Sequence, residues 1–363
     1  MEYGFNPERR NFVKAAFAGV FGSKILQSGT VECRVEKNNA VPHEIEPGIK
    51  LALIVNGIPD EDQLTFIRQL GIEYIEAWLP GREVTYTDIL NYRNKVEAAG
   101  LKLFSTDILD AYNSDQFILG LPGRDQKIKQ LQEFIRNLGK AGLHTTTYGF
   151  GAGSVYSTGV INIRGCDTRL FDLEEARKKS LAYGRVYSEE EVWDNYEYFI
   201  KRVLPVAEDA GVRLAMHPCD PPVSLRGCPR LFSSRKAFER AMEIANHSKY
   251  SGISFCVGTW GEMAGPDGKG EDVIGAIRHF GKTGHIFTVH FRNVSSPLPR
   301  FHETFVDNGY IDMSAVMKTL AEVGFNGTVV PDHVPHFKDE KRLGHISASG
   351  TAYTIGYMRA LLQ

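Results

Sequence analysis

Short apolar runs alternate with amphipathic segments from residue 49 to the end of the chain. The run at 286–290, IFTVH, predicts a short buried strand, whereas apolar residues in 124–141 recur at the spacing of one helix face. The predicted strands are 51–55, 72–78, 101–106, 144–150, 212–217, 253–256, 286–290 and 328–332. The predicted helices are 59–70, 87–99, 124–141, 190–210, 234–245, 272–280, 311–323 and 350–361.

Eight alternating strand–helix units predict an α/β fold, a (β/α)8 or TIM barrel, as a single domain over residues 49–363. The alternation is interrupted at 151–172, which is rich in Gly, Ser and Thr, and we expect a long loop there. Tyr156, Arg164 and Arg169 are its groups best suited to a polar anionic ligand. A lid over a binding site and a solvated surface insertion both remain open for this segment.

Four consecutive predicted strands finish in side chains that bind metals, namely His217, Cys256, His290 and Asp332. Taken singly, each has an ordinary explanation, such as a turn histidine, a buried thiol, a core histidine or a loop cap. Because barrel strands carry their chemistry at the same rim, the shared position favours one divalent metal site. Two imidazoles, a thiolate and a carboxylate permit Zn, Fe, Co or Mn.

Other polar residues lie close to these ligands along the chain. His333 directly follows the predicted aspartate ligand and is predicted to be a general acid or base. Arg292 is predicted to bind a substrate carboxylate, with an ion pair at the barrel rim as the alternative. His302 and Glu303 are predicted to contact substrate or to support the site from behind.

The composition is that of an ordinary globular chain, with 363 residues, 42% hydrophobic, 24% charged and a net charge of −2. This balance does not indicate a nucleic-acid partner, so we expect a small-molecule substrate, and a homo-oligomer remains open. No run of 18 or more apolar residues follows the N-terminus, so we expect no membrane span in the body. The five dispersed cysteines argue against a disulfide framework.

The N-terminus has a different character from the body. Residues 6–18, NPERRNFVKAAFA, combine a twin arginine with a weakly hydrophobic stretch. We predict a twin-arginine export signal in residues 1–33 and a polar linker at 34–48, and therefore a periplasmic or otherwise exported protein. The alternative is a surface helix with two chance arginines in a cytoplasmic protein.

Five motifs resemble those of the mannonate dehydratases, a family of xylose isomerase-like TIM barrels. They are HPCDPP (217–222), FCVGTWGEM (255–263), HFRNV (290–294), FHETF (301–305) and PDH (331–333). The resemblance covers about residues 50–363. It implies a lyase of hexuronate degradation that dehydrates D-mannonate, or a related sugar acid, to 2-keto-3-deoxy-D-gluconate with Mn(II) or Fe(II). It also implies the four predicted residues as metal ligands and His333 as an acid/base group.

The chain departs from the family's pattern in three places. Cys219 stands where the family usually has an aspartate, and residues 151–169 lack its usual Trp-Thr-Arg-Thr run. The family's Pro-Gly-Tyr-Gly stretch, whose tyrosine is a second catalytic group, is replaced by RLGHIS at 342–347, where His345 is the predicted substitute. Without the tyrosine, a metal-dependent sugar or sugar-acid epimerase or isomerase is the alternative function. A non-catalytic sugar-acid-binding protein is a third.

Overall fold

The structure is a computed structural model that describes residues 47–80, 84–338, 340, 342–344 and 346–363. The predicted signal segment at 1–33 and most of the predicted linker at 34–48 lie outside the described residues. His345, the predicted second catalytic group, also lies outside them.

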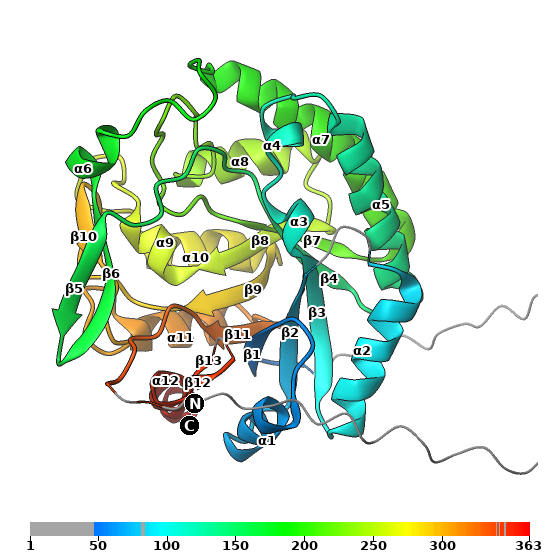
Figure 1. Cartoon of the computed structure of the whole chain (residues 1–363), viewed down its shortest axis with the longest axis vertical. Coiled ribbons are helices and arrows are strands. Elements are labelled where there is room, and N and C mark those ends of the chain that lie inside the picture. Colours follow the sequence, from blue (N-terminus) through cyan, green and yellow to red (C-terminus); the bar gives the residue numbers. More distant parts are fainter. Residues whose placement is uncertain (1–46, 81–83, 339, 341, 345) are drawn as a thin grey trace, which may run out of the picture. The chain divides into compact units, whose positions relative to one another are not determined.

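Eight parallel strands form a sheet that curls into a nearly closed barrel (Figure 1). The strand order is β3-β2-β1-β11-β9-β8-β7-β4, and the two end strands of this order pack against each other. The predicted (β/α)8 barrel is therefore confirmed. The barrel strands are β1 (Lys50–Asn56), β2 (Tyr74–Leu79), β3 (Lys102–Ile108), β4 (Thr145–Gly149), β7 (Arg213–His217), β8 (Ser251–Cys256), β9 (Ile286–Phe291) and β11 (Thr328–Pro331).

Helices surround the barrel and bury their apolar faces against it (Figure 1). The longer helices are α1 (Glu61–Gln69), α2 (Tyr86–Ala98), α5 (Arg124–Lys140), α7 (Glu189–Ala210), α8 (Arg235–Ile244), α10 (Val273–Lys282), α11 (Met313–Glu322) and α12 (Ala348–Leu361). All eight lie within a few residues of a predicted helix. Four short helices are not among the predicted ones: α3 (Leu109–Tyr112), α4 (Asp115–Ile118), α6 (Leu173–Arg177) and α9 (Val257–Glu262).

Local capping chemistry sets several helix boundaries. Before α1, the Asp60 carboxylate accepts a hydrogen bond from the backbone N–H of Gln63 at 2.8 Å. The side-chain oxygen of Gln63 in turn accepts one from the backbone N–H of Asp60 at 3.0 Å. Ser188 and Glu191 form the same reciprocal cap before α7. Because such caps satisfy backbone donors that a first helical turn leaves free, the helices begin at these residues. Gly211, with φ of +69°, ends α7 in the left-handed conformation that glycine adopts readily.

The segment predicted as a long loop at 151–172 contains a β-hairpin, so that prediction is wrong. Strands β5 (Gly159–Ile163) and β6 (Cys166–Asp172) pair in antiparallel fashion, and β10 (Arg300–His302) adds a third strand beside β6. The strand pairing of β6 with β10, a distant segment, stabilises the hairpin, and the local sequence of 151–172 gives no sign of this pairing. A two-stranded sheet, β12 (Arg342–Leu343) with β13 (Ile346–Ser347), lies near the C-terminus.

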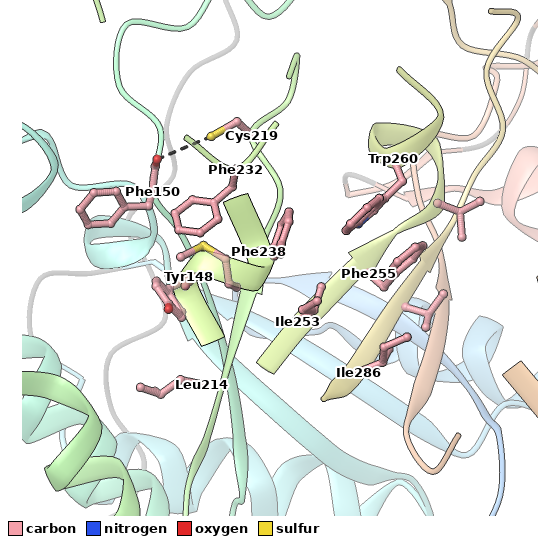
Figure 2. Packing of buried hydrophobic residues seen from close by; sticks show 14 of the residues in the cluster. Tyr148, Phe150, Leu214, Cys219, Phe232, Phe238, Ile253, Phe255, Trp260 and Ile286 are labelled. Atoms are coloured by element: carbon pink, nitrogen blue, oxygen red, sulfur yellow. Dashed lines mark hydrogen bonds between the residues drawn. The ribbon is translucent and has the colours of Figure 1, made fainter. Parts of the chain in front are cut away.

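Fully buried aromatic rings pack around strands β4, β7 and β8 (Figure 2). Phe255 in β8 stacks on Trp260, with ring centroids 4.8 Å apart and planes at 6°. Phe150, directly after β4, packs edge-on against Phe232 at 6.4 Å. Close packing of this kind leaves side chains few alternative positions. Phe255 directly precedes Cys256, so the packing of the Phe255 ring fixes the position of the Cys256 thiol at the end of β8.

No helix in the described part of the chain is both long and apolar enough to cross a bilayer.

Candidate active site

Three side chains of types that can bind metals emerge at neighbouring strand ends. His217 ends β7, Cys256 ends β8, and His290 is the last residue but one of β9. The three strands are adjacent and parallel, and Cys256 pairs with His290 across β8 and β9. One ligand atom from each of the three residues lies within 4.8 Å of the other two. Three of the four predicted ligands therefore form one group.

Asp332, the fourth predicted ligand, directly follows β11 and borders this group. Its Oδ2 lies 3.8 Å from the Cys256 Sγ and 3.6 Å from the His290 Nδ1. The four residues thus converge at one rim of the barrel.

The electrostatics of these donors fit a divalent cation. Burial acts to raise the pKa of the Cys256 thiol. The Arg292 guanidinium and hydrogen bonds with both histidines have a larger, opposite effect, so the pKa lies well below its ordinary value. Burial also acts to lower the pKa of His290, yet Asp332 and Cys256 raise it well above its ordinary value. The His290 Nδ1 is buried without a hydrogen-bond partner. A site that concentrates negative donors and leaves an imidazole nitrogen free suits a cation that replaces protons.

Two buried carboxylates inside the barrel were missed by the sequence analysis. Asp107 in β3 accepts hydrogen bonds from the Thr147 amide at 2.5 Å and the Thr146 hydroxyl at 3.2 Å. Burial raises its pKa to about 7. Glu76 in β2 is buried as well and hydrogen-bonds to Thr328. An acidic residue within an otherwise buried strand is the sequence signal that could have found both.

His333 is held in a fixed orientation by several partners. Its φ of +46° lies in the left-handed region, which a histidine adopts only at a cost. The imidazole Nδ1 contacts the Glu303 carboxylate, and the Tyr156 hydroxyl lies 2.9 Å from Nε2. Burial alone would lower the pKa of His333, but the charges of Asp332 and Glu303 raise it to about 9. Such orientation is what an acid/base group requires.

Arg292 is almost completely buried and contacts carboxylates of the protein. Its nitrogens lie 2.6 Å from Asp220, 2.7 Å from Glu262 and 3.0 Å from Asp332. It is not among the residues that line the two cavities at this rim of the described barrel. The structure therefore gives Arg292 the ion pairs that are the alternative to a substrate clamp.

The other two predicted substrate contacts lie at and after the end of β10. Glu303 accepts a hydrogen bond from the Arg169 Nε at 2.8 Å and lines the cavity beside His333. His302 places its Nδ1 3.1 Å from the Glu303 backbone oxygen and lines neither of the two cavities. Of the two residues, Glu303 is the one beside the predicted acid/base group.

Two cavities meet at Tyr156 and His333. The first has a volume of about 550 Å³ and includes His217 and His290 in its wall. The second, of about 600 Å³, includes Glu303. Residues shared by the two walls are Trp78, Tyr156, Asp332 and His333. Three of the four predicted metal ligands and the predicted acid/base group thus face a common space with room for a sugar-sized molecule, and Cys256 lines neither cavity.

The wall of the first cavity also contains Tyr112, Arg226 and Arg230, which the sequence analysis does not single out. The two arginines lie in the segment that follows β7. Loops that follow barrel strands build the catalytic face, so an arginine shortly after a predicted ligand is a usable signal. Tyr112 ends α3, a helix too short to be recognised from hydrophobic periodicity.

A protein-family model described as D-mannonate dehydratase (UxuA) matches residues 50–169 and 159–363. The chain belongs to the D-mannonate dehydratase family. This membership confirms the predicted resemblance and the predicted enzyme class, a hydro-lyase of the mannonate dehydratase type.

Individual members of the D-mannonate dehydratase family resemble the chain over most of its length. A mannonate dehydratase of Thermotoga petrophila is 32% identical over 350 residues, covering 83% of this chain and 94% of that protein. The crystal structure of mannonate dehydratase from Streptococcus suis serotype 2 superposes with a TM-score of 0.76 at 28% identity, covering 87% and 95% of the two chains. An L-ribulose 3-epimerase structure, at 15% identity and a TM-score of 0.57, covers 87% and 95% and shares the barrel fold.

Proposed function

We propose that the protein dehydrates D-mannonate, or a closely related aldonate, to 2-keto-3-deoxy-D-gluconate. The observation that carries this proposal is that His217, His290, Asp332 and His333 share the wall of one cavity. Cys256 lies behind that wall, with a ligand atom within 4.8 Å of those of both histidines and its Sγ 3.8 Å from Asp332. Membership in the D-mannonate dehydratase family supports the choice of substrate and reaction.

The four converging donors would hold a divalent cation, and we propose Mn(II) or Fe(II). Two imidazoles, a carboxylate and a thiolate are compatible with either ion. When bound, the cation would supply Lewis-acid stabilisation of negative charge that develops on the substrate carboxylate.

The chain's own residues would manage two protons. In the dehydration, a base removes the proton from C2, the C3 hydroxyl leaves as water after gaining a proton, and the resulting enol becomes the 2-keto group. His333 moves one of these protons, because its imidazole borders both cavities. Glu303 orients that imidazole through its contact with Nδ1.

Tyr156 is a candidate for the second proton-transfer group alongside His345. Its hydroxyl lies 2.9 Å from the His333 Nε2 and its side chain borders both cavities. Arg169 holds the tyrosine in place, since its guanidinium stacks 4.0 Å from the ring centroid and donates to the Tyr156 backbone oxygen at 2.9 Å. A phenol here could therefore fulfil the role of the tyrosine missing from residues 342–347.

The function is tested by incubating the Mn(II)-loaded protein with D-mannonate in deuterated water and following the products by NMR. The expected product is 2-keto-3-deoxy-D-gluconate. Deuterium exchange or a stereoisomer without loss of water would replace the proposal with the epimerase or isomerase alternative. An unchanged but tightly bound substrate would favour a binding protein. Iron-loaded protein and elemental analysis of the purified chain address the choice of metal.

The second proton-transfer group is tested with Tyr156→Phe and His345→Phe. Loss of an acid/base group lowers kcat by about 10²- to 10⁴-fold. If Tyr156 protonates the leaving hydroxyl, Tyr156→Phe should still exchange the C2 proton with solvent while releasing no water. Full turnover by Tyr156→Phe, together with a large loss in His345→Phe, would transfer the role to His345.

We also propose that residues 1–33 direct export through the twin-arginine route. The twin arginine at Arg9 and Arg10 supports this location. Cell fractionation of the full chain should place it outside the cytoplasm, and Arg9→Lys combined with Arg10→Lys should retain it inside. Equal cytoplasmic retention of both forms would favour a cytoplasmic enzyme.

A further inference from the structure

Arg230 is a buried cation without an acidic partner among the described residues. Arg230 is only 5% exposed. Its Nη1 donates to the backbone oxygens of Asp220 at 3.0 Å and Pro221 at 3.4 Å. Its Nε is buried and has no hydrogen-bond partner. No carboxylate oxygen of the described chain forms an ion pair with it within 4.0 Å. A buried charge without a counter-charge is unfavourable, so this guanidinium calls for an anion from outside the chain.

Arg230 lines the cavity whose wall also contains the predicted metal ligands His217, His290 and Asp332. Gly151 lies in the same wall, and a Cβ at this glycine would be 3.4 Å from the Arg230 Cζ and 3.0 Å from the Cys219 Sγ. A larger residue would crowd the guanidinium, and glycine leaves the space beside it free. Cys219 itself points its thiol to the Phe150 backbone oxygen at 3.6 Å (Figure 2).

Arg226 adds a second positive charge to this cavity wall. Its φ of +53° places it in the left-handed region, and its Nε donates to the Ser180 backbone oxygen at 3.0 Å. Like Arg230, it forms no ion pair with a carboxylate of the described chain. Two guanidiniums near one cavity provide the forked donors that recognise a carboxylate.

The carboxylates in the same wall are already engaged. Asp115 accepts a hydrogen bond from the Tyr183 hydroxyl. Asp220 is paired with Arg169 and Arg292. The third carboxylate is Asp332, a predicted metal ligand. None of them forms an ion pair with the two arginines after β7, so the positive charge there is free to attract a ligand.

We infer that Arg230, supported by Arg226, binds the carboxylate of the sugar-acid substrate. The substrate class rests on the proposed function, whereas the anion site rests on the unpaired charge alone. The inference moves the carboxylate clamp from Arg292, which is saturated by protein carboxylates, to the segment that follows β7. Arg230 would fix which end of the aldonate approaches the metal ligands and His333.

The test compares a sugar acid with a neutral ligand of the same carbon skeleton. Binding of D-mannonate and D-mannitol to the Mn(II)-loaded full chain is measured by calorimetry in a His333→Asn background, which prevents turnover. Asparagine tolerates the left-handed backbone at this position. Arg230→Met should weaken D-mannonate binding about 10- to 100-fold and leave D-mannitol binding unchanged. Arg230→Lys, which keeps the charge, should retain part of the affinity.

Arg136→Met, on the exposed face of α5, is the matched control and should bind both ligands as the parent does. Unchanged D-mannonate affinity in Arg230→Met would overturn the inference. Equal losses for the acid and the polyol would overturn it as well, because they would mean that the arginine only shapes the cavity.

A second measurement is independent of the proposed function. Acetate, at an ionic strength matched with chloride, should raise the melting temperature of the parent protein and not that of Arg230→Met, because a ligand stabilises only a protein that binds it. An equal rise in both proteins would overturn the anion site. If acetate discriminates but D-mannonate neither binds nor reacts, the anion site stands and the proposed substrate is wrong.

Discussion

Two pairs of arginines lie at the same rim of the barrel and differ in what surrounds them. Arg169 and Arg292 are packed among Asp220, Glu262 and Glu303, and each contacts at least three carboxylates. The side chains of the pair after β7, Arg226 and Arg230, donate their hydrogen bonds to backbone oxygens. The guanidinium groups of Arg169 and Arg292 therefore hold protein carboxylates in place, and we call them the scaffold pair. Those of Arg226 and Arg230 have no carboxylate partner among the described residues, and we call them the open pair.

The difference shows why residue type does not reveal a substrate contact. Burial acts to raise the pKa of Asp220, but Arg169 and Arg292 lower it far below its ordinary value, so that carboxylate is a charged partner. Burial and the neighbouring Asp220 raise the pKa of Glu262 to about 8. The charged carboxylates Asp220 and Glu303, whose pKa values are lowered, thus balance the scaffold arginines, whereas Glu262 contributes hydrogen bonds more than charge. No carboxylate balances Arg230 in this way among the residues that the structure describes. An arginine that has no carboxylate partner within the protein is therefore the better candidate for binding an anionic ligand.

The largest effect should come from removing a scaffold arginine. Arg292→Met leaves Asp220 and Asp332 without their shared buried cation, and breaking a buried pair in this way costs about 3–5 kcal/mol. The free energy of unfolding from urea titration should fall by that amount. A loss below about 1 kcal/mol would erase the distinction between the two pairs. Arg278→Met, in an exposed ion pair, is the control and should change little.

The scaffold pair should also make stability depend on pH. Because the pKa of Asp220 is lowered in the folded protein, its contribution is complete above the ordinary value of 3.8 and is lost as the pH falls below that value. The stability difference between the parent and Asp220→Asn should therefore be largest near neutral pH and shrink below about pH 4. Urea titrations across this acidic range and at neutral pH measure it. A difference that grows on acidification would contradict the charged pairing.

Removing the open arginine should affect stability much less. In Arg230→Met, relief of an unpaired buried charge offsets the loss of two hydrogen bonds to backbone oxygens, so the free energy of unfolding should stay within about 1 kcal/mol of the parent. The same urea titration checks this value. A loss as large as that of Arg292→Met would place Arg230 among the scaffold residues.

The smallest effect is expected at Arg226, which is only partly buried. Solvent screens partly exposed charges, so Arg226→Met should weaken D-mannonate binding by only about two- to fivefold. The calorimetric titration used for Arg230 measures it. A loss greater than that of Arg230→Met would reverse the order of the two arginines within the subsite.

Much of this architecture could be predicted from hydrophobic periodicity. Most barrel strands are short, largely apolar runs, and the carboxyl ends of parallel strands lie at one rim of the barrel. The sequence alone is therefore enough to place His217, Cys256 and His290 together. The hairpin at β5 and β6 could not be predicted, because alternating residues such as Ile161 and Ile163 stand among glycines and gain a third strand from β10 far along the chain.

The arginines show a second kind of limit. Arg292 is a natural candidate from the sequence because it lies two residues after the predicted ligand His290. Arg230 lies further along the chain from His217, so its signal is weaker, and yet it lines the first cavity. Whether a guanidinium is saturated depends on carboxylates from several separate segments, such as Asp220, Glu262 and Glu303 around Arg292 and Arg169. No local pattern in the sequence encodes that set of neighbours.

The three-stranded sheet has a consequence for synthesis of the chain. Phe171 in β6 pairs with Phe301 in β10, about 130 residues later, and Glu303 follows β10 directly. A growing chain can close the β5–β6 hairpin early, since its partners are local, but the third strand and Glu303 must wait for translation of the seventh barrel strand and the loop after it. Glu303, which contacts the His333 imidazole, is therefore synthesised late. An incomplete chain carries most of the barrel and no working acid/base assembly, so chemistry begins only when translation is nearly finished.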